Sequence, residues 1–306
     1  MSPPGASYSA AAEVAAFRQR RSRWQRGWIE LRKAPPSALL GLAIIAFYLV
    51  LALFAPWIAP HGEAEIFAQP FAPWGEEHRL GTDQIGRDIL SRLIYGARNT
   101  IGIALATTLL AFLIGGSLGL AAAIGRGWLD QLLSRGVDVL MAIPSLIFAL
   151  MLLSIFGSSA ASLILIIATL DATRVFRLTR AVALDVAVMD YVEAARLRGE
   201  GLGWVMRREI LPNIMPPLVA EFGLRFCFVF LTIASLSFLG VGIQPPTADW
   251  GSMVRENAQL IQFAQYDLRA AVTPLIPAAA IALLTVGVNF VVDWFLQKTS
   301  GIRDEH

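Results

Sequence analysis

Cysteine, lysine and histidine are scarce in this chain, and charged residues as a whole are few. Cys227 is the only cysteine among the 306 residues, which excludes an internal disulfide framework and a multi-cysteine metal site. The three histidines, His61, His78 and His306, are too far apart in the sequence for a local zinc motif. Charged residues make up 16% and hydrophobic residues 56%, against about 25% and about 45–50% in soluble domains. This composition is that of an integral membrane protein.

Motifs for nucleotide hydrolysis and for metal-dependent catalysis are also missing. A P-loop requires Gly-Lys followed by Ser or Thr, but Lys33 follows Arg32 and Lys298 follows Gln297. No His-Glu-x-x-His pattern occurs, and the formal net charge of +2 gives no basic field that would predict a nucleic-acid partner. We therefore expect no enzyme activity and no catalytic or metal-binding residue. Uphill transport would need an ion gradient or an ATPase on another chain.

Six apolar segments are long enough to be membrane-spanning helices, which need about 20 residues each. The third and fourth come from a charge-free stretch, 139–170, that is too long for one span and is interrupted by the small residues 157–162. The expected spans are 34–60, 99–125, 139–156, 162–180, 214–240 and 270–292. Pro144 should kink the third span, and Pro274 and Pro277 the sixth. The predicted fold class is an all-α membrane protein with six transmembrane helices.

Basic residues predict the orientation of these spans, because cytoplasmic loops carry an excess of Lys and Arg. With the N-terminus inside, 18 basic residues fall in cytoplasmic segments and 6 in external ones, so both termini should be cytoplasmic. The expected organisation is a cytoplasmic segment 1–33, a first helix 34–60, an extracytoplasmic loop 61–98, a core 99–295 and a cytoplasmic tail 296–306. The core contains a cytoplasmic loop at about 181–213.

The basic N-terminal segment has the pattern of a helix lying on the membrane surface. Phe17, Trp24, Trp28 and Leu31 share one helical face, and arginines fill the positions between them. This helix would act as an anchor on the anionic cytoplasmic leaflet, or alternatively as a docking or regulatory element. No cleavable signal peptide is expected, because the first apolar run begins after residue 33.

The large cytoplasmic loop predicts two short helices joined by a glycine-rich turn. A helix over 191–198 would stop at Gly199, and a second helical piece would cover 205–210. The segment Glu193-Ala194-Ala195 would present small residues on an exposed side, where another protein's surface could approach closely. The alternative is that this loop only caps the helix bundle.

The same loop resembles the EAA motif of ABC-importer permeases. That motif reads Glu-Ala-Ala, three residues, Gly, nine residues and then x-x-Leu-Pro, and this sequence matches it in register. The resemblance implies a coupling helix that inserts into a cleft of a cytoplasmic ATPase. The residues it assigns to this coupling are Tyr191, Glu193, Ala194, Ala195, Arg198, Gly199, Leu211 and Pro212.

Two further stretches, 80–98 and 236–251, resemble the C-type member of the permease pair in dipeptide/oligopeptide/nickel importers. The first contains Leu80-Gly81-Thr82-Asp83 and the second Leu236-Ser237-Phe238-Leu239-Gly240. The resemblance implies a type I ABC importer permease of the bacterial inner membrane. It also implies a second, B-type permease, two ATP-binding cassette ATPases and an extracytoplasmic substrate-binding protein as partners. ATP and Mg would bind only those ATPases, and this chain would carry no cofactor.

Peptides, either di- or oligopeptides, are the expected cargo, with a nickel chelate, glutathione or another small solute as the alternative. Glu221 and Arg225, spaced i, i+4 in the fifth span, would form a structural pair or line the translocation path. A self-sufficient secondary transporter is the competing class. It predicts inverted repeats and a midplane carboxylate, whereas no convincing repeat is visible and Glu221 is offset by Arg225.

Two other groups of residues have predicted roles. The external residues Asp83, Arg87, Asp88 and Arg92 would either pair among themselves on a helical surface or dock the binding protein. The glycines of the second span would allow close helix packing. These are Gly102, Gly115, Gly116 and Gly119.

Overall fold

The computed structural model describes residues 34–125 and 127–300, and this part of the chain is almost entirely helical. Its only β-type pairing is one isolated bridge between Thr82 and Asp88. The helices are α3 (Pro36–Ile58), α4 (Ile89–Gly125), α5 (Gly127–Ala142), α6 (Ser145–Phe156), α7 (Ala160–Ala187), α8 (Asp190–Leu197), α9 (Leu202–Val205), a π-helical turn (Met206–Ile210), α10 (Leu211–Phe238), α11 (Trp250–Asn257), a 3-10 turn (Ala258–Phe263), α12 (Leu268–Val272) and α13 (Leu275–Ser300). The predicted interfacial helix within 1–33 lies outside the described residues.

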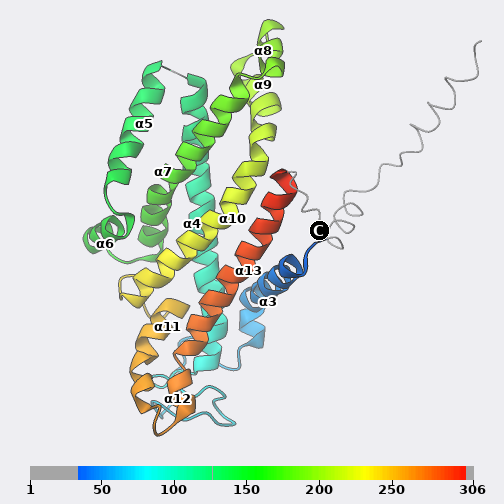
Figure 1. The fold of residues 1–306 in the computed structure, drawn as a ribbon. Helices are drawn as coiled ribbons and strands as arrows, with labels where there is room; N and C mark the ends of the chain where they lie inside the picture. Colours follow the sequence, from blue (N-terminus) through cyan, green and yellow to red (C-terminus); the bar gives the residue numbers. More distant parts are fainter. Residues whose placement is uncertain (1–33, 126, 301–306) are drawn as a thin grey trace, which may run out of the picture.

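The long helices α4, α7, α10 and α13 run along the long axis of the molecule (Figure 1). Helices α8 and α9 form one end, whereas the irregular segment 59–88 lies with α11 and α12 at the opposite end (Figure 1). The loop predicted to be cytoplasmic and the loop predicted to be external therefore lie at opposite ends of one bundle. This is the arrangement that a membrane-spanning protein requires.

Four helical stretches in the described part are long and apolar enough to cross a membrane: 36–58, 89–125, 202–238 and 268–298. The pair α5 and α6 adds a fifth if the two helices together make one span. Helix α7 has the length of a span, with 28 residues, but its charged side chains between Asp171 and Asp185 keep it out of this set. The helical fold class is thus confirmed with four to five apolar spans, while the predicted fourth span, over 162–180, stays a prediction.

The predicted third span differs from the structure. Instead of a loop over 126–138 and one kinked helix over 139–156, residues 127–142 already form a helix, and α5 and α6 meet at a bend of 89°. Pro144 causes the break, because it has no N–H to continue the ladder of α5 and disfavours helical geometry in the residue before it. Ion pairs of Asp130 with Arg180, and of Asp138 with Arg177, fasten α5 to α7.

Glycines allow α4 and α7 to approach closely. A Cβ atom at Gly115 would lie 2.8 Å from the Cβ of Val175, and one at Gly119 would lie 2.7 Å from the carbonyl oxygen of Phe176. Gly102 and Gly116, in contrast, have open space where a Cβ would be. The packing role predicted for these glycines is therefore confirmed at two positions and wrong at the other two.

The sixth predicted span is interrupted near its start. Helix α12 ends at Val272 and α13 begins at Leu275, so the chain leaves helical geometry at Pro274. Pro277 lies in the first turn of α13, where a missing N–H has no helical partner to lose. The predicted interruption by proline is confirmed at Pro274, and Pro277 is accommodated without a break.

Candidate functional sites

Two residues separate the end of α7 from the start of α8, which projects at one end of the molecule (Figure 1). Asp190 and Glu193 lie in its first turn and Arg196 in its last, where each charge opposes the partial charge of the helix end. Gly199 then turns the chain with a φ of +83°, and its N–H donates to the carbonyl of Arg196 over 2.9 Å. The predicted glycine stop is present, and it reverses the chain towards α9.

Residues 190–210, which we call the coupling loop after its predicted role, are firmly packed on their inner face. Val192 and Ala195 of α8 are completely buried, in one apolar cluster with Val205 and Ile210. The cluster continues onto α7 through Ala187. The prediction that all of Glu193-Ala194-Ala195 faces outwards is therefore wrong for Ala195, because the helical period turns it inwards.

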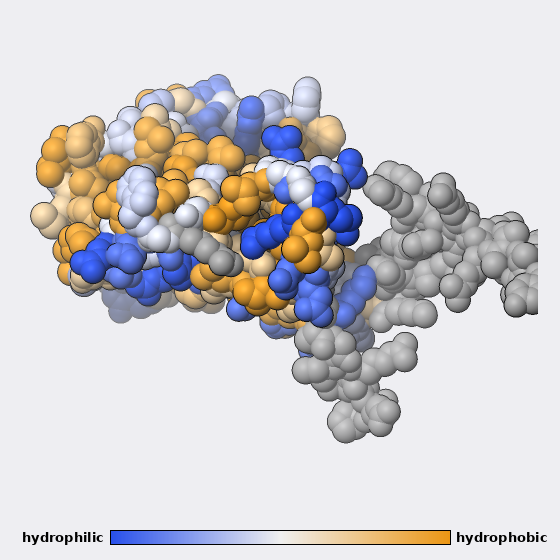
Figure 2. Space-filling view, turned by 90° about the horizontal axis from the view of Figure 1, so that it is seen from above, coloured by the Kyte–Doolittle hydropathy of each residue, from blue (hydrophilic) through white to orange (hydrophobic). Residues whose placement is uncertain are grey.

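The outer face of the coupling loop is exposed and partly apolar. Glu193, Ala194 and Arg198 are exposed, as is Tyr191. Large apolar side chains stand out beside them, with Leu197 82% and Leu202 63% exposed. Figure 2 looks onto this end of the molecule and shows hydrophobic and strongly hydrophilic residues side by side. An apolar surface of this kind at a loop tip is typical of a protein-binding site.

The last two residues of the motif begin the next long helix. Leu211 and Pro212 form the first turn of α10, where a proline is tolerated, directly after the π-helical turn. The stretch 202–238 is helical throughout, so the coupling loop is continuous with the body of α10. The loop and the residues that α10 carries therefore belong to one unbroken helical stretch.

Halfway along α10, Glu221 and Arg225 form the ion pair that their spacing predicts. Arg225 Nε donates to Glu221 Oε1 over 2.5 Å. The structure adds a partner from α7, because Arg225 Nη1 also lies 3.7 Å from Asp171 Oδ1. Arg174, one turn further along α7, reaches the same oxygen at 3.8 Å. These four residues form a charge cluster between two helices whose formal charges cancel, which we call the mid-bundle cluster.

At the opposite end, the four predicted docking residues are buried. Arg87 Nε donates to Asp83 Oδ2 over 2.7 Å, and Arg87 Nη2 donates to Glu256 Oε2 over 2.9 Å. Arg92 Nη2 donates to the same Glu256 oxygen over 3.1 Å. Each of these side chains is at most 6% exposed. Asp83, Arg87, Arg92 and Glu256, which we call the external ring after the predicted side of their loop, therefore pair internally and offer little surface to a partner. The geometry favours self-pairing, with only Arg92 on a helix.

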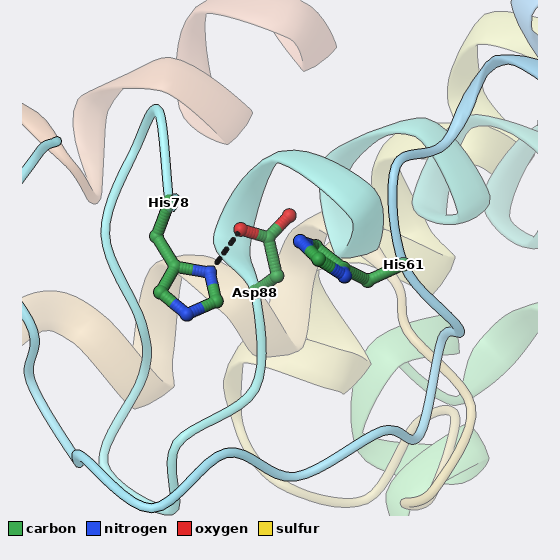
Figure 3. A group of neighbouring side chains, drawn as sticks. All are labelled: His61, His78 and Asp88. Atoms are coloured by element: carbon green, nitrogen blue, oxygen red, sulfur yellow. Dashed lines mark hydrogen bonds and ion pairs between the residues drawn. The ribbon is translucent and has the colours of Figure 1, made fainter. Parts of the chain in front are cut away.

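Asp88, the fourth of these residues, caps α4 and meets two histidines (Figure 3). Its Oδ2 accepts the backbone N–H of Ser91 over 2.8 Å, and its Oδ1 lies 3.0 Å from His78 Nδ1. The fold also brings His61 beside them, with possible metal-ligating atoms of the three residues all within 4.8 Å of one another. Both Asp88 oxygens already have protein partners, and Phe67 packs on both imidazoles. The group is explained as the anchor of the α4 N-terminus.

The two stretches that suggested the peptide-importer branch pack against each other at this end. A Cβ at Gly96 would lie 2.8 Å from Trp250 Cδ1, so only glycine admits the indole ring. Trp250 is 1% exposed, and its Nε1 donates to the carbonyl of Leu93 over 2.9 Å. Asp249 caps α11 by accepting the N–H of Gly251 over 2.9 Å. Burial raises the pKa of the Asp249 carboxyl, and hydrogen bonds from Ser252 partly oppose this.

Sequence reasoning missed two charged residues that complete these clusters. Nothing in the sequence of α7 indicates that Asp171 meets Arg225 on α10. Glu256 joins two arginines that precede it by more than 160 residues. Among the contacts of these two missed residues, only the one between Asp171 and Arg174 has a local signal, because their i, i+3 spacing predicts a pair on one helix.

A solved structure shares this fold. A chain of the MetNI methionine ABC transporter, in an inward-facing conformation, matches with a TM-score of 0.52 over 68% of this chain and 97% of that chain, at 16% identity. The long apolar helices and this likeness define the class of protein, a helical membrane protein with the type I ABC importer fold.

The family follows from sequence comparisons. The model for the binding-protein-dependent transport system inner membrane component matches residues 115–299, and that for the N-terminal TM domain of oligopeptide transport permease C matches residues 22–76. The dipeptide transport system permease protein DppC of Escherichia coli K12 is 38% identical over 279 residues, 89% of each chain. The di/tripeptide transport system permease protein DppC of Pseudomonas aeruginosa UCBPP-PA14 is 36% identical, over 88% of this chain and 86% of that protein.

This chain belongs to the family of binding-protein-dependent transport system inner membrane components. It is a multi-pass protein of the inner membrane and a transport component. The resemblance identified in the sequence is confirmed.

Proposed function

We propose that this chain is one transmembrane permease subunit of an ATP-driven importer for di- or oligopeptides. A second permease would supply the other half of the translocation path, two cytoplasmic ATPases the energy and an extracytoplasmic binding protein the substrate. Both termini and the coupling loop would lie on the cytoplasmic side. Support for the peptide cargo comes from relatives named as dipeptide permeases that match most of the chain.

The exposed tip of the coupling loop carries this proposal. Its inner face is packed onto α7, so the loop is held in place, while Leu197 and Leu202 remain exposed. Removing apolar surface of this kind from water contributes about 25 cal/mol per Å². A partner that covers the tip of 190–210 would therefore bind and be able to transmit force.

Mechanical coupling would run through α10. When the ATPases close on ATP, they would move the coupling loop, and the continuous helical stretch 202–238 would carry that motion to the mid-bundle cluster. Glu221 and Arg225 would then face the translocation path and change their access from one side of the membrane to the other. The chain itself would bind no ATP, Mg or other cofactor.

Purification of the tagged chain from its native membranes tests the proposal. We expect two P-loop ATPases and a second multi-span permease in the isolated complex, counted by mass spectrometry. A variant with Leu197→Ser and Leu202→Ser should lose the ATPases and keep the second permease. Recovery of this chain alone, still active in transport without ATP, would contradict the proposal and favour a secondary transporter.

A further inference from the structure

A pocket of about 230 Å³ opens beside the mid-bundle cluster, between α6, α7 and α10. Ser145 contributes from α6, Asp171 and Arg174 from α7, and Phe228 and Thr232 from α10. Charged side chains inside a membrane protein are costly and mark substrate or ion pathways. A pocket lined by a carboxylate and a guanidinium is therefore a candidate ligand-binding site.

Asp171 is buried but poorly partnered. Its side chain is 7% exposed, and its Oδ2 atom has no hydrogen-bond partner in the described structure. Its Oδ1 atom lies 3.7 and 3.8 Å from two guanidinium nitrogens, which is longer than a hydrogen bond. Because χ2 of an aspartate is broad and roughly two-fold, either oxygen can turn towards the pocket. The carboxylate thus has capacity to accept hydrogen bonds from a cationic ligand.

Arg174 has the complementary capacity. Its side chain is 43% exposed, and its contact with Asp171 at 3.8 Å uses one nitrogen of a guanidinium that carries five N–H donors. Arg225, in contrast, is committed to Glu221 through a short hydrogen bond. The pocket therefore presents one acceptor and one set of donors that no protein group satisfies fully.

We propose that this pocket binds both charged ends of a zwitterionic peptide, the ammonium group at Asp171 and the carboxylate at Arg174. The inference rests on the proposed function for the identity of the cargo. A cluster with no net formal charge favours a ligand that is itself neutral overall, because a singly charged ligand would leave one buried charge uncompensated. A dipeptide spans at most about 7 Å along its backbone, so it can contact two residues one helical turn apart.

Competition binding to the complete permease–ATPase complex tests the proposal. The complex is placed in phosphatidylcholine nanodiscs, so that no lipid supplies a primary ammonium group, and [¹⁴C]alanylphenylalanine is bound without the binding protein. N-acetyl-alanylphenylalanine and alanylphenylalanine amide compete with it. The wild-type complex should bind each blocked peptide at least tenfold more weakly than the free dipeptide.

Two variants separate the two ends. Asp171→Asn should weaken dipeptide binding tenfold or more and abolish discrimination against the N-acetyl form, while Arg174→Gln should abolish discrimination against the amide. Asp185→Asn, an exposed aspartate on the same helix, is the matched control and should behave as wild type. Arg174 is half exposed, so its variant keeps the test decisive if Asp171→Asn reduces the yield of complex.

Unchanged discrimination in both variants, or no dipeptide binding to the wild-type complex, would overturn the pocket assignment. ATP-driven uptake of the same dipeptide is measured in parallel with the binding protein present. Uptake together with either of these results overturns only the pocket, whereas absence of ATP-driven uptake of any peptide overturns the proposed function.

Discussion

A single backbone angle at Gly199 determines how the coupling loop turns. Its φ of +83° is in the left-handed region, which costs a residue with a side chain roughly 1–2 kcal/mol. No atom lies within 4 Å of where its Cβ would be, so the cost of a substitution is in the backbone and not in packing. Gly199 is therefore needed for the direction of the loop.

Gly199→Ala should weaken association with the ATPases by about five- to thirtyfold, the factor that 1–2 kcal/mol represents. The strained turn would relax into another conformation when the ATPases are absent, and binding would have to restore it. Titration of purified ATPase onto the permease in nanodiscs measures this. Gly203→Ala is the matched control, since Gly203 also has open space around it but no positive φ. Equal affinities for the two variants would refute the role of the turn.

Neighbouring alanines of the coupling helix should respond differently to the same substitution. Ala194 is exposed, so Ala194→Trp should leave the complex with the second permease intact and reduce ATP-driven uptake to below about one tenth. Ala195 is fully buried, so Ala195→Trp should instead lower the yield of folded protein, because overpacking a core costs about 1–3 kcal/mol. Ala161→Trp, at an exposed site near the start of α7, controls for the added indole. Full uptake by Ala194→Trp would argue against ATPase docking here.

At the scale of elements, the seam between α4 and α7 depends on two glycines one helical turn apart. Small residues let helices in a membrane approach closely, which increases van der Waals contact where no hydrophobic driving force exists. Gly115 and Gly119 meet backbone and Cβ atoms of α7, so any side chain would push the helices apart.

Gly115→Val should lower the thermal unfolding temperature of the purified complex, whereas Gly116→Val should not. Gly116 is adjacent in sequence, but no atom lies within 4 Å of where its Cβ would be. Fluorescence-detected gel filtration after heating gives the comparison directly. A similar loss of stability in both variants would show that helix propensity, and not the close approach, explains the effect.

The external ring holds the segment before α4 to α11. Glu256→Gln leaves Arg87 and Arg92 with one buried carboxylate fewer, and breaking a buried ion pair typically costs about 3–5 kcal/mol. Loss of the folded complex is therefore expected. Glu77→Gln is the control, because Glu77 is an exposed glutamate in the segment before α4. If Glu256→Gln retained wild-type stability, the ring would not be what holds this end together.

Local sequence pattern predicted the helices better than it predicted their partners. The apolar runs placed most helices, and the glycine stop and the Glu221–Arg225 pair follow from spacing alone. Helix α5 was missed because the charges of Asp130 and Asp138 are typical of a loop. Their ion-pair partners, Arg180 and Arg177, lie on α7 and are distant in the sequence. Asp171 and Glu256 were missed for the same reason, since a long-range ion pair leaves no local periodicity.

For the molecule as a whole, coupling must act over a distance. Helix α4 alone, with 37 residues, is about 55 Å long, and the coupling loop and external ring lie at opposite ends of the bundle. Helix α10 continues directly from the coupling loop, passes the mid-bundle cluster and ends at Phe238. Movement of this one helix would link ATP hydrolysis at one end to substrate access at the other.

Uptake of [¹⁴C]alanylphenylalanine into proteoliposomes tests the central claim most directly. The complete assembly, with binding protein outside the vesicle and the ATPases and ATP inside, should accumulate the dipeptide. Omission of ATP or of the ATPase subunits should abolish accumulation, because the proposed function assigns ATP hydrolysis to those subunits. Accumulation by this chain alone, driven by an ion gradient, would contradict the account.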